Sequence, residues 1–287
     1  MLKKANNYLS LVKFSHTIFA LPFAMIGFLI GAEAVDFKFH PWLVVYVLLC
    51  MIFARSAAMA FNRWADREID ARNARTVVRE IPSGKISANA ALVFTIVNCV
   101  AFIITTWFIN SLCFYLSPVA LLVVLGYSYT KRFTPLSHIV LGIGLSLAPI
   151  GAYLAVTGEF ALIPLLFSIA VVTWVSGFDI IYALQDEDFD KQNKLFSIPS
   201  VFGTKISLRI SEILHIVASL SLLIASFYGH YGWIYLSGWA IFTGLLIYQH
   251  TLVKPGDLSR VNLAFFTTNG IASVLLAIFA AAEILIN

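Results

Sequence analysis

Apolar side chains occur in long runs along the chain, and polar side chains gather in the stretches between them. The runs cover residues 16–35, 42–61, 89–109, 112–130, 136–156, 160–178, 208–228, 232–251 and 262–286. Each is about 20 residues long, which lets a helix cross a hydrocarbon layer roughly 30 Å thick. Lipid offers the backbone no hydrogen-bond partner, so helix is the expected element. The pattern predicts an all-α, polytopic membrane protein with about nine transmembrane helices.

Only two connections between the runs are long, residues 62–88 and 179–207. We expect one transmembrane domain over residues 1–287, with these two loops carrying its polar chemistry. We expect the first apolar run to stay in the mature protein and not to be removed as a signal peptide. The N-terminal segment lacks the short apolar core and small-residue cleavage site of a signal peptide.

Basic residues are distributed unevenly over the connections. Of the 19 Lys and Arg residues, all except Lys38 and Arg55 fall in segments that share one side if the N-terminus is cytoplasmic. Cytoplasmic segments of membrane proteins are enriched in Lys and Arg. The chain is therefore predicted to begin in the cytoplasm and to place both long loops there.

The composition supports a membrane protein. Hydrophobic residues make up 60% of the chain, charged residues make up 12%, and the mean hydropathy is +0.88. A soluble domain has roughly 45–50% apolar and about 25% charged residues. Cys50, Cys99 and Cys113 lie in or beside apolar runs without a C-x-x-C pair, so packing is their expected role. No nucleic-acid partner is expected.

Two polar clusters interrupt this apolar pattern in a matched way, each at the end of an apolar run. They consist of Asn62, Asp66 and Asp70, and of Asp179, Tyr182, Asp186 and Asp190. Spacings of three, four and seven predict that each cluster lies on one face of a helix that prolongs the run. Carboxylates one turn apart repel each other, and a charge near hydrocarbon costs about 2.5–3.5 kcal/mol. A divalent cation would offset that cost. Mg²⁺ is typically held by one or two carboxylates, water and substrate phosphates.

Basic side chains accompany both clusters, and guanidinium forks suit phosphate oxygens. The candidates for binding a diphosphate are Asn62, Arg75, Arg79, Lys131, Arg132 and Lys191. The expected ligand has a diphosphate head and a long hydrocarbon tail. Acids that bind a metal and cations that bind phosphate suit the head, and the apolar surroundings suit the tail.

Simpler explanations exist for individual residues. The acids could be solvated helix ends, and the basic residues could only set the topology. For Arg63 and Arg67 we expect only this role in topology. For Glu68 we expect only a place on a solvated helix end. An arginine inside a span usually faces the protein interior, so Arg55 is a candidate cavity residue. Tyr129 and Tyr182 suit either a cavity or an interfacial belt, and His16 suits packing.

At these residues the sequence resembles the UbiA superfamily of intramembrane aromatic prenyltransferases, in particular its 4-hydroxybenzoate polyprenyltransferase-like bacterial quinone branch. The resemblance rests on the paired motifs "NRWADREID" and "DIIYALQDEDFD". It extends to "RTVVREIPSGKIS", "YSYTKRFTPLSH" and "KFSHTIFALPFAMIG", and covers most of residues 13–203. Arg63 stands where the common motif has an acid, Glu80 where proline is usual, and Lys194 where glycine is frequent.

The resemblance implies helices around a central cavity and Mg²⁺-dependent transfer of a polyprenyl group from polyprenyl diphosphate to a small aromatic acceptor. It further implies a role in quinone biosynthesis at a bacterial inner membrane, with the active site toward the cytoplasm. Carried over by position, the metal ligands are Asn62, Asp66, Asp186 and Asp190. Asp70 and Asp179 would support them as further catalytic residues.

Three alternatives remain at this stage. The acceptor could be a menaquinone precursor of the dihydroxynaphthoate or futalosine type. The chain could instead be an ion-coupled transporter, although transporters usually place their acids near the bilayer midplane. A lipid head-group transferase would be expected to carry a D-G-x-x-A-R-type motif, which the sequence lacks.

Overall fold

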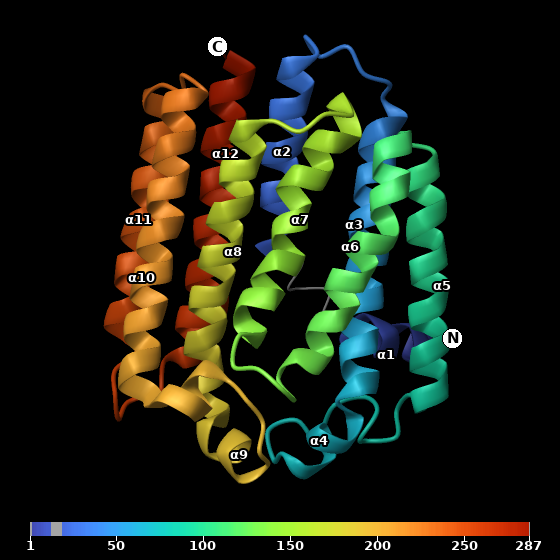
Figure 1. The fold of residues 1–287 in the computed structure, drawn as a ribbon, viewed down its shortest axis with the longest axis vertical. Helices are drawn as coiled ribbons and strands as arrows, with labels where there is room; N and C mark the ends of the chain where they lie inside the picture. Colours follow the sequence, from blue (N-terminus) through green and yellow to red (C-terminus); the bar gives the residue numbers. More distant parts are fainter. Residues whose placement is uncertain (1, 13–18, 287) are drawn as a thin grey trace. The chain divides into compact units, whose positions relative to one another are not determined.

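The chain is helical throughout the part that the structure describes. The structure is a computed structural model and describes residues 2–12 and 19–286, in which every named element is a helix (Figure 1). Seven of these helices are long and apolar enough to cross a membrane. Many of their large apolar side chains are exposed, as expected of a surface in contact with lipid. The prediction of an all-α membrane protein is confirmed.

The helices form two compact units, which are described separately. The first comprises residues 1–17 and 41–129. Its helices are α1 (Leu2–Leu11), α3 (Trp42–Ala65), α4 (Arg67–Arg72), α5 (Ala88–Trp107) and α6 (Ser111–Thr130), the last of which ends at the boundary. Helix α3 packs against α5, and α1 packs against α3. A small core of Leu11, Ala60, Ile86 and Ala91 joins these helices at the end of α3 that carries the first motif.

The second unit comprises residues 18–40 and 130–287. Its elements are α2 (Leu21–Ala34), α7 (Ser137–Thr157), α8 (Leu162–Ala183), η2 (Leu184–Asp186), α9 (Glu187–Gln192), α10 (Ile198–Tyr228), α11 (Trp233–Leu252), η3 (Leu263–Thr268) and α12 (Asn269–Ile286). Helix α8 packs against both α7 and α10. The core contains the fully buried rings of Phe167, Trp174, Tyr235 and Phe242.

Small residues allow the helices of the second unit to approach closely. A Cβ added to Gly142 of α7 would lie 2.5 Å from the carbonyl oxygen of Val172 in α8. A Cβ on Gly27 of α2 would meet the carbonyl oxygen of Pro149 in α7. Small residues at helix contacts are characteristic of membrane proteins, in which packing rather than water exclusion holds helices together.

Each predicted apolar run coincides with helix in the described residues. Two helices differ from the other long ones: α2 has 14 residues, and α11 has 20 residues but is not among the seven. Residues 16–18, at the start of the first predicted run, lie outside the described residues, and so does His16. The number of crossings and the cytoplasmic N-terminus therefore stay predictions.

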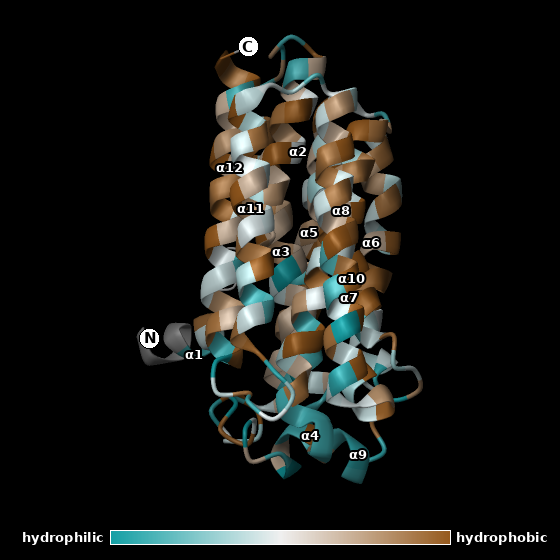
Figure 2. Cartoon of the chain, turned by 90° about the vertical axis from the view of Figure 1, so that its left-hand side faces the viewer, coloured by the Kyte–Doolittle hydropathy of each residue, from teal (hydrophilic) through white to brown (hydrophobic). Residues whose placement is uncertain are grey.

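The expectation that each acidic cluster lies on one continuous helix is wrong. Helix α3 ends at Ala65, and Asp66, with φ −93° and ψ 3°, separates it from α4. Helix α8 ends at Ala183, and Asp186, with φ −105° and ψ 5°, separates η2 from α9. Each unit thus breaks its helix at an aspartate in the sparsely populated bridge region, where active-site residues are often found. Figure 2 shows the hydrophilic colouring of α4 and α9, which follow these breaks.

The second long loop is also shorter than predicted. Helix α10 begins at Ile198 rather than near residue 208, and Ser197 caps it. Gly203, with φ 74° and ψ 166°, interrupts α10 five residues after its start. The apolar pattern could not show this first turn and a half, because these residues precede the run that crosses the membrane.

Candidate functional site

The first motif is built around the break between α3 and α4. Asn62 lies in the last turn of α3, and its Nδ2 donates to Oδ2 of Asp66 over 3.2 Å. The backbone N–H of Asp66 donates to the carbonyl of Asn62, and Asp66 in turn accepts from the N–H of Asp70. Asp66 is 2% exposed. The break therefore holds a buried carboxylate beside an amide that donates to it.

Asp70 is anchored more firmly than a simple solvated cap would be. One carboxylate oxygen accepts from Nη1 of Arg79 over 2.7 Å, while the other is buried without a hydrogen-bond partner among the described residues. Thr76 donates its hydroxyl proton to the backbone carbonyl of Asp70. Arg79 was predicted to bind diphosphate, and its bond to Asp70 gives it an internal partner. That contact shows how the loop after α4 is folded back onto the motif.

Two charged residues near the first motif, Arg63 and Glu80, are buried. Arg63, for which the sequence suggests no role beyond topology, is 5% exposed and interacts electrostatically with Asp70 and Glu80. Glu80 is 6% exposed and accepts a hydrogen bond from the Ser10 hydroxyl of α1. Both charges belong to the network around the first motif. Arg67 donates to the Trp64 carbonyl and covers the Trp64 ring, and its expected role in topology stays a prediction.

The second motif begins with a hydrogen bond between neighbouring helices. Oδ2 of Asp179, near the end of α8, lies 2.7 Å from Nδ1 of His138, in the first turn of α7. Nε2 of His138 accepts from the backbone N–H of Ile198 over 3.4 Å. His138 therefore touches the motif on one side and the start of α10 on the other. Sequence reasoning did not single out His138, because its partner lies 41 positions away.

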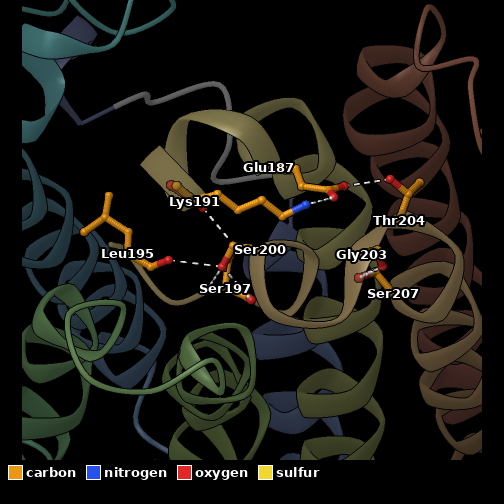
Figure 3. Close-up of polar contacts among 9 residues, drawn as sticks. Glu187, Lys191, Leu195, Ser197, Ser200, Gly203, Thr204 and Ser207 are labelled. Carbon is orange, nitrogen blue, oxygen red and sulfur yellow. Dashed lines mark hydrogen bonds and ion pairs between the residues drawn. The ribbon is translucent and has the colours of Figure 1, made fainter. Parts of the chain in front are cut away.

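Asp190 is held by the segment that starts α10. The Ser197 hydroxyl donates to Oδ2 of Asp190 over 2.8 Å, and accepts from the backbone N–H of Ser200 in a capping box (Figure 3). The backbone N–H of Phe196 donates to the carbonyl of Lys131 over 2.7 Å. The segment 195–200 thus links two parts of the predicted site, Asp190 and the Lys131 backbone.

The side chain of Lys191 pairs with a carboxylate one turn earlier in α9. Its Nζ lies 2.6 Å from Oε1 of Glu187, and the Thr204 hydroxyl donates to Oε2 of the same carboxylate (Figure 3). Lys191 is exposed, so its role in binding diphosphate stays a prediction. Glu187 connects α9 to the residue that follows the break at Gly203.

The remaining candidates lie in both units. Arg55 is half-buried in α3 and interacts electrostatically with Tyr127. Arg75 is exposed, and Arg132 and Asp186 are half-buried. The roles of these residues stay predictions, and so do those of Tyr129 and Tyr182 as cavity residues. The rings of Tyr129 and Tyr182 pack against Phe61 and Phe265, respectively.

The side chains at the two breaks fit a hard divalent cation. Neither unit, over its described residues, gathers three His, Cys, Asp or Glu side chains into a metal cluster. Carboxylate and amide oxygens, one or two from the protein, are the donors that Mg²⁺ accepts together with water and phosphate. The orphaned, buried oxygen of Asp70 is evidence that the first motif is built around a charge that its own side chains do not supply in full.

Comparisons with known proteins agree with this organisation. The model of the UbiA prenyltransferase family matches residues 20–271. The 4-hydroxybenzoate octaprenyltransferase of Burkholderia mallei is 32% identical over 250 residues, which cover 84% of each chain. The 4-hydroxybenzoate octaprenyltransferase of Photobacterium profundum is 32% identical over 242 residues, which cover 81% of this chain and 80% of the relative.

Solved structures show the same fold. A UbiA homologue from Aeropyrum pernix K1, in its apo form, superposes with a TM-score of 0.80 at 28% identity, over 94% of this chain and 97% of the homologue. A UbiA homologue from Archaeoglobus fulgidus bound to GPP and Mg²⁺ superposes with a TM-score of 0.73 at 19% identity, over 97% and 99% of the two chains. With the family match over most of its length, this chain belongs to the UbiA prenyltransferase family and is an integral-membrane prenyltransferase.

Proposed function

We propose that the protein transfers a polyprenyl group from polyprenyl diphosphate to a 4-hydroxybenzoate-like aromatic acceptor, with Mg²⁺ bound to the two acidic motifs. The observation that carries this proposal is the matched break at Asp66 and Asp186, each of which follows a long apolar helix. The curated relatives with about a third of residues identical are 4-hydroxybenzoate octaprenyltransferases, and the A. fulgidus homologue holds GPP and Mg²⁺.

The proposed reaction is an electrophilic aromatic substitution. The allylic C–O bond breaks, its electron pair leaves with the diphosphate, and the ring carbon ortho to the phenol oxygen bonds to the prenyl carbon. The ring then loses its proton, either to Asp179 or to the released diphosphate. When bound, Mg²⁺ would neutralise the charge that grows on the diphosphate. Water would quench the allylic cation, so a lipid-embedded apolar site favours the intended product.

The side chains of each motif would have separate tasks. Asn62, Asp66, Asp186 and Asp190 would hold the metal, and Asp70 would support the first motif through its bond to Arg79. Lys131 and Arg132 would bind phosphate oxygens, since cations that face a leaving group stabilise its developing charge.

A menaquinone precursor of the dihydroxynaphthoate or futalosine type is the second candidate acceptor, since it also carries an electron-rich ring. Membership of a prenyltransferase family does not favour the transporter alternative. We further propose that the protein resides in a bacterial inner membrane, with both acidic motifs toward the cytoplasm, because the basic residues gather in those segments.

The test is a product assay with purified protein. Incubation with Mg²⁺, a polyprenyl diphosphate and a panel of phenolic and naphthoic acids, read by mass spectrometry, should yield one prenylated 4-hydroxybenzoate-like acid. Omission of Mg²⁺ or addition of a chelator should abolish the product. Prenylation of a menaquinone precursor alone would select the second acceptor, and the absence of any prenylated product would reject the proposed reaction.

A further inference from the structure

His138 is a buried ionisable residue that the reaction scheme above does not use. It is 4% exposed and lies in the first turn of α7. Its two ring nitrogens have different partners, the carboxylate of Asp179 in α8 and the backbone N–H of Ile198 at the start of α10. One imidazole thus joins three helices of the second unit at the motif.

The contacts determine where the ring carries its proton. The N–H of Ile198 can only donate, so Nε2 of His138 accepts and the proton resides on Nδ1. Nδ1 then donates to Oδ2 of Asp179 over 2.7 Å. This arrangement holds one carboxylate oxygen in a fixed direction. The Asp179 side chain remains 23% exposed, so part of the carboxyl group is accessible to another molecule.

Packing between α7 and α8 keeps the pair in register. Gly142, one turn after His138, lies so close to α8 that an added Cβ would be 2.6 Å from the Ser176 hydroxyl. The single proton of that hydroxyl is shared between the carbonyl of Val172, over 2.6 Å, and the carbonyl of His138, over 3.1 Å. The backbone of His138 therefore contacts α8 independently of its ring. The contact between the ring and Asp179 is a separate link between the two helices.

We infer that His138 is a positioning residue that orients Asp179 toward the aromatic acceptor. The inference rests on the proposed function and extends it to a residue outside the acidic motifs. The ring of His138 bonds to Asp179 and to the Ile198 N–H, whereas Ser197, beside Ile198, bonds directly to Asp190, a predicted metal ligand. His138 reaches Asp190 only through a longer-range electrostatic interaction. A defect at His138 should therefore affect reaction of the acceptor more than binding of the prenyl diphosphate.

Two isosteric variants separate the two ring contacts. His138→Asn retains a donor near the Nδ1 position, and His138→Gln retains an acceptor near the Nε2 position. If orientation of Asp179 matters, His138→Gln should lower kcat by at least about tenfold, as loss of a supporting hydrogen bond often does, whereas His138→Asn stays within about threefold of wild type. The KM for polyprenyl diphosphate should change by less than about twofold in both.

A matched control tests whether helix packing alone explains the effect. Ser168→Ala removes another hydrogen bond between α8 and α7, from the Ser168 hydroxyl to the Ser146 carbonyl over 2.9 Å. It lies about three turns from Asp179 along the helix. The control should retain kcat. Equal losses in His138→Gln and Ser168→Ala, equal losses in the Gln and Asn variants, or normal turnover of His138→Gln would each overturn the inference.

A double-mutant cycle tests the connection itself. In an Asp179→Asn background, His138→Gln should lower kcat by no more than about twofold further, because residues that act as a pair are not additive. Additive losses would contradict the inference. If wild type forms no product with any acceptor, the proposed function fails, and the same cycle is then read from melting temperatures. Coupled melting shifts would support the contact, and additive shifts would reject it.

Discussion

The two central aspartates share a backbone conformation that a helix does not provide. Asp66 and Asp186 have φ near −100° and ψ near zero, and each separates a membrane helix from a short polar one. At Asp66 the backbone hydrogen bonds to Asn62 and from Asp70 persist, so the break is a local change of φ and ψ that redirects the chain after the aspartate. This local similarity supports the idea that the two motifs are related, with one motif in each unit.

The first residue-scale prediction concerns these aspartates. Asp66→Ala and Asp186→Ala should each lower turnover at least about a hundredfold, since each removes a ligand that stabilises charge on the leaving diphosphate. Glu68→Gln and Asp188→Asn are matched controls, because both acids are exposed and lie beside the breaks. The controls should stay near wild type in the same product assay. Normal turnover of either alanine variant would remove that residue from the metal site.

A second prediction concerns the buried ion pair. Arg79→Ala removes the cation that is hydrogen-bonded to the Asp70 carboxylate, whose side chain is 4% exposed, and leaves only the electrostatic interaction with Arg63. Removal of one partner of a buried pair strands the other charge, so we expect a loss of roughly 2–4 kcal/mol in unfolding free energy, moderated by the partial exposure of Arg79. Thermal melting in detergent measures the loss.

The exposed Arg72→Ala, in α4, is the control for that loss and should melt near wild type. Asp70→Asn combined with Arg79→Ala should recover part of the stability, because a neutral amide tolerates burial better than an unpaired charge. A double variant less stable than Arg79→Ala alone would show that the pair is not the source of the stabilisation.

Among the elements, α10 shows most clearly how local structure serves the site. Its first residues lie outside the apolar run, its N-cap donates to Asp190, and Gly203 interrupts it before the long apolar part. Thr204, just beyond the interruption, donates to Glu187 of α9. The short piece 198–202 and α9 are therefore joined by side-chain hydrogen bonds at both ends.

Ser197→Ala should affect both stability and metal use. Loss of an N-cap costs about 1 kcal/mol. Loss of the bond to Asp190 should also raise the Mg²⁺ concentration for half-maximal activity about tenfold, as changes to residues that orient metal ligands commonly do. Ser87→Ala is the matched control, since Ser87 caps α5 by accepting from the Ala90 N–H. It should lose stability without a change in Mg²⁺ requirement, and a shift of the same size in both variants would reject the link to Asp190.

Gly203→Ala tests the break in α10. Nothing lies within 4 Å of an added Cβ, so any cost arises from the backbone at φ +74°. Side chains are strained in this region by about 1–3 kcal/mol, and the melting temperature should fall accordingly. Gly244→Ala, inside α11 with equally open surroundings, is the control. It should be neutral or stabilising by up to about 1 kcal/mol, because alanine suits a helix better than glycine.

At the scale of the whole molecule, the number of helices that cross the membrane is still a prediction. Helix α11 has 20 residues but is not among the seven helices that are both long and apolar enough to cross. In a background that lacks the three native cysteines, Trp233→Cys and Lys254→Cys mark its two exposed ends. If nine helices cross and the N-terminus is cytoplasmic, a membrane-impermeant maleimide should label only Trp233→Cys in intact cells.

Permeabilised cells provide the control for that experiment, and both sites should then be labelled. Labelling of both sites, or of neither, in intact cells would show that α11 does not cross. Labelling of Lys254→Cys alone would invert the topology. The 20 residues of α11 and the positive-inside pattern favour the first outcome.

The helices were predictable because lipid leaves the backbone few choices. A run of apolar residues long enough to span the bilayer must satisfy its own hydrogen bonds, and each predicted run coincides with helix. Asn62, Asp66 and Asp186 were predictable as site candidates for a related reason. Acids beside hydrocarbon are costly, so a matched pair of acidic clusters indicates a compensating charge.

The breaks in the helices were not predictable, because a spacing of four fits a continuous helix as well as an interrupted one. The burial of Arg63 was hidden for a similar reason, since a basic residue at a cytoplasmic helix end normally needs no explanation beyond topology. Only the folded loop around Asp70 and Glu80 gives Arg63 its surroundings.

The sequence alone determined that this protein is a helical membrane protein of the prenyltransferase type, because hydropathy and the paired acidic motifs act locally along the chain. Tertiary structure decided how those motifs are supported. His138 reaches Asp179 across 41 positions, and Ser197 reaches Asp190 from the next helix. Such contacts depend on how closely neighbouring helices pack, as they do at Gly142. The linear sequence does not show which helices are neighbours.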